Sequence, residues 1–183
     1  MTSPLPEDIL DYWYREVGAD AWFKPDVGRD KEIRDRFLPL HQSAIAGALS
    51  GWEENPTGML GLMLILDQFP RAMFRNTAQA FATDATALDL ARTAIIRHFD
   101  DRIDVGYKLC FYLPFAHSEN LSDQRLSLFY IRERTKNPDW LDRAEHHYQA
   151  IQRFERFPER NKALGRPSTA EEEAYLLKPV VEF

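Results

Sequence analysis

Apolar residues recur along the chain at the three- and four-residue spacing that marks one face of an α-helix. Near the N-terminus, Ile9, Trp13 and Val17 follow this spacing. Pro6 precedes them at a position typical of a helix start, and Gly18 follows as a stop. The chain shows no strand-like alternation and no Asn-Gly hairpin signal. The pattern therefore predicts an all-α fold.

Two segments are apolar on every side, which is typical of helices in the middle of a fold. The first spans residues 59–69 and is expected to end at Pro70, because proline removes a backbone donor from a helix. The second spans residues 107–115 and is expected to close at Pro114. Both segments are expected to lie in the core.

Capping residues predict further helix starts. Pro39 is expected to kink or interrupt the helix that follows the first cap and ends near Gly51. A long helix is expected over residues 140–157. Short connections predict antiparallel helical hairpins packed side by side in one domain, residues 1–183. The expected caps are Asp30, Asp84, Ser122 or Asp123, and Ser168, which opens a capping box with Glu171.

Composition and charge narrow the function classes. The hydrophobic fraction is 44% and the aromatic fraction 13%, which favours a well-packed globular core. The net charge of −6 argues against a protein that binds nucleic acid through its phosphates, because such binding needs a basic face. The N-terminus lacks a signal peptide and no apolar run is long enough to span a membrane, so a cytoplasmic protein is expected.

Two aromatic–proline–arginine segments are the most informative motifs. The first runs from Asp67 to Arg75 and the second from Arg153 to Asn161, and each places arginines between phenylalanines. Guanidinium groups keep their charge in proteins, so each must find a carboxylate or a ligand anion where it leaves water. The segments therefore predict an organised polar site. The candidate ligand-binding residues are Asp67, Arg71, Arg75, Arg153, Arg156, Arg160 and Asn161.

Three further residues are candidates for acid–base chemistry. His117 and Glu119 follow Pro114 in a loop or at a helix start, where scaffolds often place functional polar groups. On the helix over 140–157, His146 and Arg153 fall on one stripe that borders an apolar face. His117, Glu119 and His146 are therefore the candidate catalytic residues. Metal binding is not predicted, because no His-x-x-x-His or Glu-x-x-His spacing fixes two ligands on one helix.

Cofactor motifs are missing from the sequence. The chain has no glycine-rich phosphate loop, no Gly-x-Ser-x-Gly nucleophile turn and no Cys-x-x-Cys pair. No cofactor is therefore predicted, and the single cysteine, Cys110, lies in an apolar run typical of a buried, inert thiol.

Taken together, the motifs resemble those of the bacterial family named domain of unknown function 924. The resemblance implies a tetratricopeptide-like superhelical array, although the chain lacks the consensus of true tetratricopeptide repeats. It implies no activity and assigns no residue a role. Ala116, Glu155 and Glu159 depart from the family's usual Glu, Gly and His. The matching segments are residues 66–71, 73–75, 80–84, 112–114, 117–119, 153–161, 164–166 and 168–169.

Three functions fit these observations. The arginines outnumber the carboxylates of the motifs, which favours binding of an anionic small molecule or an acidic peptide. An enzyme would use His117, Glu119 and His146 for proton transfer while arginines hold an anionic substrate. In a purely structural network, the arginines would only join helices through carboxylates and carbonyls. A cavity beside the motif arginines would separate the first two functions from the third. The oligomeric state is not indicated.

Overall fold

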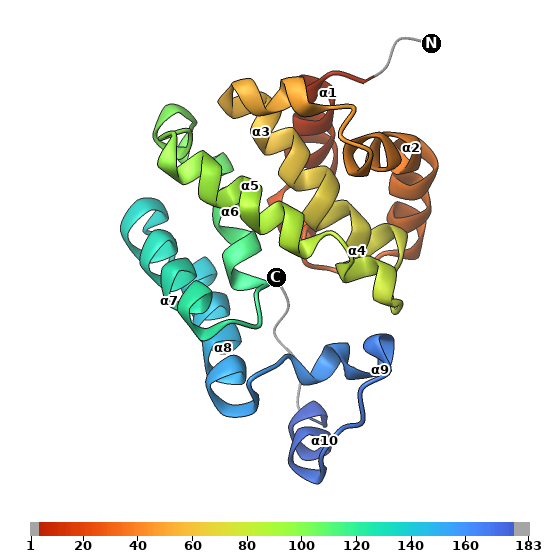
Figure 1. The fold of residues 1–183 in the computed structure, drawn as a ribbon, viewed down its shortest axis with the longest axis vertical. Helices are drawn as coiled ribbons and strands as arrows, with labels where there is room; N and C mark the ends of the chain where they lie inside the picture. The colour runs from red at the N-terminus through yellow and green to blue at the C-terminus, as the bar shows by residue number, and fades with distance from the viewer. Residues whose placement is uncertain (1–3, 178–183) are drawn as a thin grey trace.

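The computed structural model describes residues 4–177. Within this range every regular element is helical, so the predicted all-α fold is confirmed (Figure 1). Sequential helices lie against each other, with α5 on α6, α6 on α7 and α7 on α8. The tetratricopeptide-like superhelical arrangement and the single-domain organisation stay predictions. No helix within residues 4–177 has the length and apolar character needed to cross a membrane.

The elements follow one another in this order. The N-terminal half contains α1 (Pro6–Asp11) with a π-helical continuation (Tyr12–Val17), α2 (Val27–Ile45), α3 (Pro56–Met63), a π-helical turn (Leu64–Gln68), α4 (Phe69–Met73) and α5 (Asp84–Ile96). The C-terminal half contains α6 (Val105–Ala116), α7 (Leu121–Tyr130) with a π-helical end (Ile131–Thr135), α8 (Pro138–Phe154), α9 (Asn161–Leu164) and α10 (Ala170–Leu176). Short 3-10 segments join them at Ala19–Ala21, Ser50–Glu54, Ala78–Phe81, Asp100–Arg102 and Pro158–Arg160.

The two apolar segments form the centre of the core, as predicted. The run from α3 through α4 contacts α1, α2, α5 and α6, and its residues 58–70 are all buried. Residues 109–117 of α6 and its C-cap are likewise buried. Removing this apolar surface from water is the main stabilising contribution to the fold. The polar residues at the ends of these two segments are therefore held by rigid elements.

The predicted interruption at Pro39 and the predicted helix end at Pro70 are wrong, whereas α6 ends within two residues of Pro114. Pro39 lies inside the continuous helix α2, and Pro114 lies in the last turn of α6. The central run continues past Pro70 into α4, after the π-helical turn Leu64–Gln68. Proline costs a helix one donor and some local strain, and the burial of neighbouring turns outweighs that cost here. Helix α2 also ends at Ile45 and not near Gly51.

The caps lie near the predicted positions but fall on other residues. Asp26, not Asp30, caps α2 by accepting the backbone N–H of Arg29 at 2.9 Å. Asn120, not Ser122 or Asp123, caps α7. In α10 the capping box pairs Thr169 with Glu172, one position beyond Ser168 and Glu171. Asp84 begins α5 without capping it. Each true cap has extended backbone, which the sequence pattern does not fix.

After α8 the chain changes direction. Glu155 adopts a left-handed conformation with φ of 57° and ends the helix. Figure 1 shows the chain leaving the α7–α8 pair and returning toward α4 before it forms α9 and α10. The second aromatic–proline–arginine segment is thereby brought beside the first.

Candidate functional site

A pocket of about 190 Å³ lies where the two motif segments meet. Its walls come from four parts of the chain: the π-helical end of α1 and the start of α2, the α4 region, the end of α6 with α8, and the α9 segment. The cationic residues of the lining are Lys24, Arg29, Arg71, Arg75 and Arg160, and the acidic ones are Asp30 and Glu159. The aromatic residues of the lining are Trp13, Trp22, Phe23 and Phe81, together with His117 and His147.

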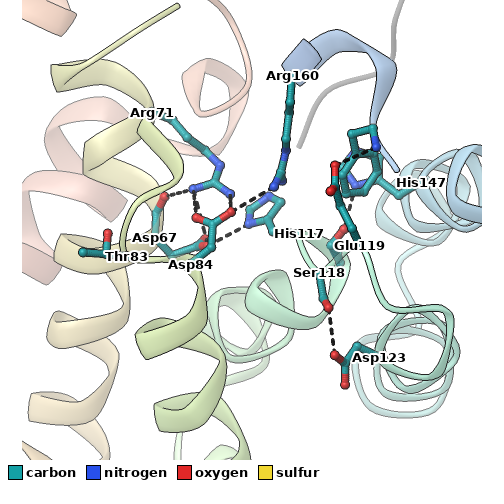
Figure 2. A network of polar contacts seen from close by, with 12 residues as sticks. Asp67, Arg71, Thr83, Asp84, His117, Ser118, Glu119, Asp123, His147 and Arg160 are labelled. Atoms are coloured by element: carbon teal, nitrogen blue, oxygen red, sulfur yellow. Dashed lines mark hydrogen bonds and ion pairs between the residues drawn. The ribbon is translucent and has the colours of Figure 1, made fainter. Parts of the chain in front are cut away.

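Asp84 joins the two motifs at the inner side of the pocket. Arg71 donates to both of its carboxylate oxygens at 3.1 Å, and Arg160 donates to Oδ2 at 3.1 Å. Figure 2 shows the two guanidinium groups approaching this carboxylate from different sides. The side chains of Arg71 and Arg160 are only 17% and 11% exposed. Two buried cations therefore share one carboxylate at the pocket wall.

Asp67 and His117 form a second buried pair beside these arginines. His117 Nδ1 lies 2.8 Å from Asp67 Oδ1, and each side chain is 2% exposed. The other oxygen of Asp67 accepts a hydrogen bond from the amide of Gln68 at 2.5 Å. Asp67 and Gln68 both belong to the π-helical turn Leu64–Gln68, and such turns often occur at functional sites. His117 caps the C-terminus of α6, so both partners belong to core helices.

The charges of this pair follow from its surroundings. Burial opposes ionisation of Asp67, but the charge of Arg71 and the interaction with His117 outweigh it, so the pKa of Asp67 lies well below its ordinary value. Burial, and then Arg71, lower the pKa of His117 below its ordinary 6.5 despite the nearby Asp67. Asp67 is therefore ionised and His117 neutral near neutral pH.

The segment that carries His117 is fixed by hydrogen bonds on both sides. The amide of Gln124 donates to the carbonyls of Ala116 and Ser118, each at 2.7 Å. His147 Nδ1 lies 3.0 Å from the Ala116 carbonyl, and Ser118 donates to Asp123 at 2.8 Å. His117 thus has little freedom to reorient.

Aromatic side chains cover the pocket's apolar side. Trp13 and Trp22 stack with ring centroids 5.8 Å apart, and the Trp22 indole donates to the Trp13 carbonyl at 2.9 Å. The guanidinium groups of Arg71 and Arg160 lie over the Phe81 ring, at 5.8 and 4.6 Å from its centroid. The site therefore combines flat apolar surface with positive charge.

The predicted ligand-binding residues divide between two places. Arg71, Arg75 and Arg160 line the pocket, and Arg75 also donates to Asp30 at 2.6 and 2.8 Å. Asp67 is outside the lining but bonds two lining residues, Gln68 and His117. Arg153 and Arg156 lie outside the lining. They pair with Glu171 and Glu172 of α10, and Asn161 bonds Ser168 and Arg166.

The predicted pairing of His117 with Glu119 is not formed. Glu119 instead accepts two hydrogen bonds from Arg166, at 2.7 and 2.9 Å, and one from the backbone N–H of Phe157 at 2.8 Å. Its carboxylate fastens the chain after α8 to the loop after α6. Asp67, fifty positions before His117, takes the place that the sequence assigned to Glu119.

His146, predicted at the border of an apolar face, does not reach the pocket. His146 is exposed and lies beside the carbonyl of Asp142, one turn earlier on α8. Its neighbour His147 is buried and lines the pocket. The sequence contained a signal for this, since His147 shares a face with Ala144 and Ile151, which are buried. The other contributions that sequence reasoning missed are Asp84 as a shared carboxylate, and Trp13, Trp22, Phe81 and Arg29 as lining residues.

Comparisons with other proteins place the chain in a family without assigning it an activity. No curated protein matches the chain. The solved structure of a protein of unknown function, ATU0120 from Agrobacterium tumefaciens, is similar with a TM-score of 0.88 and 40% sequence identity, over 93% of this chain and 96% of that one. Residues 9–180 match the family described as bacterial protein of unknown function (DUF924), and the chain belongs to this family.

Proposed function

We propose that the pocket binds a small anionic molecule with a flat apolar part. One observation carries this proposal: Arg71 and Arg160, from motifs far apart in sequence, meet at the wall of one pocket and both bind the carboxylate of Asp84, while Arg71 also pairs with Asp67 at 3.5 Å. A carboxylate or phosphate is the group that guanidinium donors recognise best.

The electrostatics of the lining favour an anion. Burial, and then the positive charge of Arg71, lower the pKa of Arg160. The carboxylates of Asp84, Glu119 and Glu159 act on this pKa in the opposite direction, and Arg160 keeps its charge. Lys24 and Arg29 add positive charge to the lining. An incoming anion would relieve the repulsion between the two inner guanidinium groups.

The size and walls of the pocket favour a small ring-containing ligand. An apolar cavity of about 150 Å³ holds benzene, so about 190 Å³ suits a single ring with an anionic substituent. Stacked Trp13 and Trp22 and the ring of Phe81 supply flat surfaces. The volume therefore favours a small molecule over an acidic peptide.

The structural alternative accounts for part of the arrangement. Arg71, Arg75, Arg153, Arg156 and Arg160 each have a protein carboxylate, as that alternative requires. It also requires that no cavity adjoin them, and three of the five line the pocket. Ligand binding is consistent with both the carboxylate partners of the arginines and the pocket beside three of them.

A titration of the purified protein with benzoate and with phenyl phosphate tests the proposal. Arg160→Gln removes an inner charge, and Arg153→Gln removes an exposed arginine of the same motif as a matched control. At a hundred times the dissociation constant, a bound probe should raise stability by about 2.7 kcal/mol. We expect this stabilisation in the wild type and in Arg153→Gln, and its loss in Arg160→Gln. Equal loss in both variants, or no binding of either probe, would contradict the proposal.

Acid–base catalysis is a second candidate, favoured by the Asp67–His117 pair beside the pocket. Asp67 now takes the role that the sequence assigned to Glu119. A carboxylate-backed imidazole is a common general base. His117→Asn should then abolish turnover of a substrate while leaving the affinity for a bound anion largely intact. A substrate turned over equally well by this variant would exclude the role.

A further inference from the structure

One ring nitrogen of His117 has no partner. Nε2 is buried and makes no hydrogen bond with any residue in the range 4–177. His117 itself lines the pocket, and Figure 2 shows the ring edge opposite Asp67 turned toward Arg160, another lining residue. A buried polar atom without a partner costs about 1–3 kcal/mol, so native proteins rarely retain one without a reason.

The protonation of His117 determines what Nε2 can bind. The Asp67 carboxylate only accepts hydrogen bonds, so Nδ1 must carry the proton of the neutral ring. Nε2 is then an acceptor with a lone pair and no hydrogen. An anionic oxygen would be repelled there, whereas an O–H or N–H group would be attracted.

The N–H donors of the pocket lining are the indoles, the amides of Gln68 and Asn76 and the cationic side chains, and none of them bonds Nε2. Among the residues that line the pocket, none is Ser, Thr, Tyr or Cys. The guanidinium of Arg160 donates to Asp84 and lies over the rings of Phe81 and Phe157. A donor on the molecule that fills the pocket would give Nε2 the hydrogen bond that the described residues do not give it.

We propose that this molecule carries an O–H or N–H group in addition to its anionic group, as an aromatic hydroxy acid or amino acid does. The anion would lie on Arg71 and Arg160, and the donor would meet Nε2 of His117. Asp67 is a positioning residue that fixes the tautomer. This inference rests on the proposed anion binding and names the chemical class of the ligand.

Binding of benzoate and of the three hydroxybenzoate isomers tests the inference. The four probes share a ring and a carboxylate and differ only in the donor. Satisfying a buried acceptor should make at least one isomer bind about tenfold tighter than benzoate, which corresponds to about 1.4 kcal/mol. In His117→Leu the ratio of hydroxybenzoate affinity to benzoate affinity should fall to about one, whatever the affinity for benzoate itself. In Asp67→Asn the preference for a hydroxybenzoate should weaken. An amide can donate to Nδ1, so the proton of the neutral imidazole is no longer fixed on that nitrogen.

Nitrogen NMR of the wild-type imidazoles provides a readout that does not depend on a variant folding. We expect His117 near neutral pH to carry its proton on Nδ1 only, and the preferred hydroxybenzoate to move the Nε2 resonance more than benzoate does. A proton on Nε2, or an Nε2 resonance unchanged by a bound hydroxybenzoate, would overturn the inference.

The outcomes separate this inference from the proposed function. If benzoate and every hydroxybenzoate bind the wild type equally, anion binding stands and the donor requirement is wrong, because a water or Arg160 then satisfies Nε2. If none of the four binds and phenyl phosphate also fails, the proposed function is wrong and the inference is overturned with it.

Discussion

Two clusters of arginines in this protein both pair with carboxylates, but one lies at the pocket and the other joins α8 and the chain after it to α10. The inner cluster is Arg71 and Arg160 around Asp84, buried at the wall of the pocket. The outer cluster is Arg153 and Arg156 on Glu171 and Glu172 of α10, away from the pocket. Three of the four arginines come from one short motif. The comparison shows that membership of a motif does not decide whether an arginine binds a ligand or fastens a helix.

The backbone explains why the second motif divides. In a continuous helix, Arg153, Arg156 and Arg160 would share one face, because they are three and four positions apart. Glu155 instead ends α8 in a left-handed conformation, and Pro158 begins a separate 3-10 turn. Arg160 is thereby directed toward Asp84, while Arg153 and Arg156 remain beside α10.

Removing the shared carboxylate should have the largest effect. Asp84→Ala leaves Arg71 and Arg160 buried beside each other without their common partner, and breaking a buried ion pair in this way costs about 3–5 kcal/mol. Urea denaturation of the wild type and variant measures this loss. A loss below about 1 kcal/mol would show that the inner cluster is as weakly coupled as an exposed pair.

Arg156→Ala should act locally on α10. Arg156 donates to both oxygens of Glu172 at 2.6 and 2.8 Å, and Glu172 also caps the helix through Thr169. Without this pair, the backbone amides of residues 170–176 should exchange hydrogen faster, whereas those of α6 should not change. Faster exchange in both helices would mean that the outer cluster also supports the core.

Glu155→Gly should stabilise the protein modestly. A left-handed backbone at φ of 57° costs a residue with a side chain about 1–2 kcal/mol, and glycine avoids this cost but loses more entropy on folding. We expect a gain of about 1 kcal/mol in thermal unfolding, with the pocket unchanged. A loss of stability would indicate that the Glu155 side chain makes a contribution larger than its backbone strain.

Arg153→Ala should have the smallest effect. Its side chain is 54% exposed and its partner Glu171 is 60% exposed, and such surface pairs contribute about 0–1 kcal/mol. The thermal unfolding temperature should fall only slightly, and less than in Asp84→Ala. A loss comparable to that of Asp84→Ala would remove the distinction between the clusters.

The sequence predicts the helical class, the two central apolar segments and several of the residues that the structure brings together at the pocket. Asp67 and Arg71 are identified from the first aromatic–proline–arginine segment, and His117 from its place after an apolar helix. The partner of His117 is not, because Asp67 and His117 are brought together only by packing of the central run on α6. Arg160 meets Asp84 across 76 positions, a contact that no local pattern contains.

The errors have a common physical cause. The sequence pattern placed His146 at the border of an apolar face, interrupted a helix at Pro39 and ended one at Pro70, because it reflects local periodicity and local propensity alone. Tertiary packing overrides both where a segment is buried on all sides. His147 illustrates this, since one position along α8 separates an exposed imidazole from one that lines the pocket.

The most direct test of the account is to locate bound 4-hydroxybenzoate by amide chemical-shift changes in isotope-labelled protein. The account predicts that the changes concentrate on residues of the inner cluster and pocket, around Gln68, Arg71, His117 and Arg160, and spare α10. Changes centred on Arg153, Arg156 and α10, or no changes at saturating probe, would contradict the claim that the inner cluster forms an anion-binding pocket.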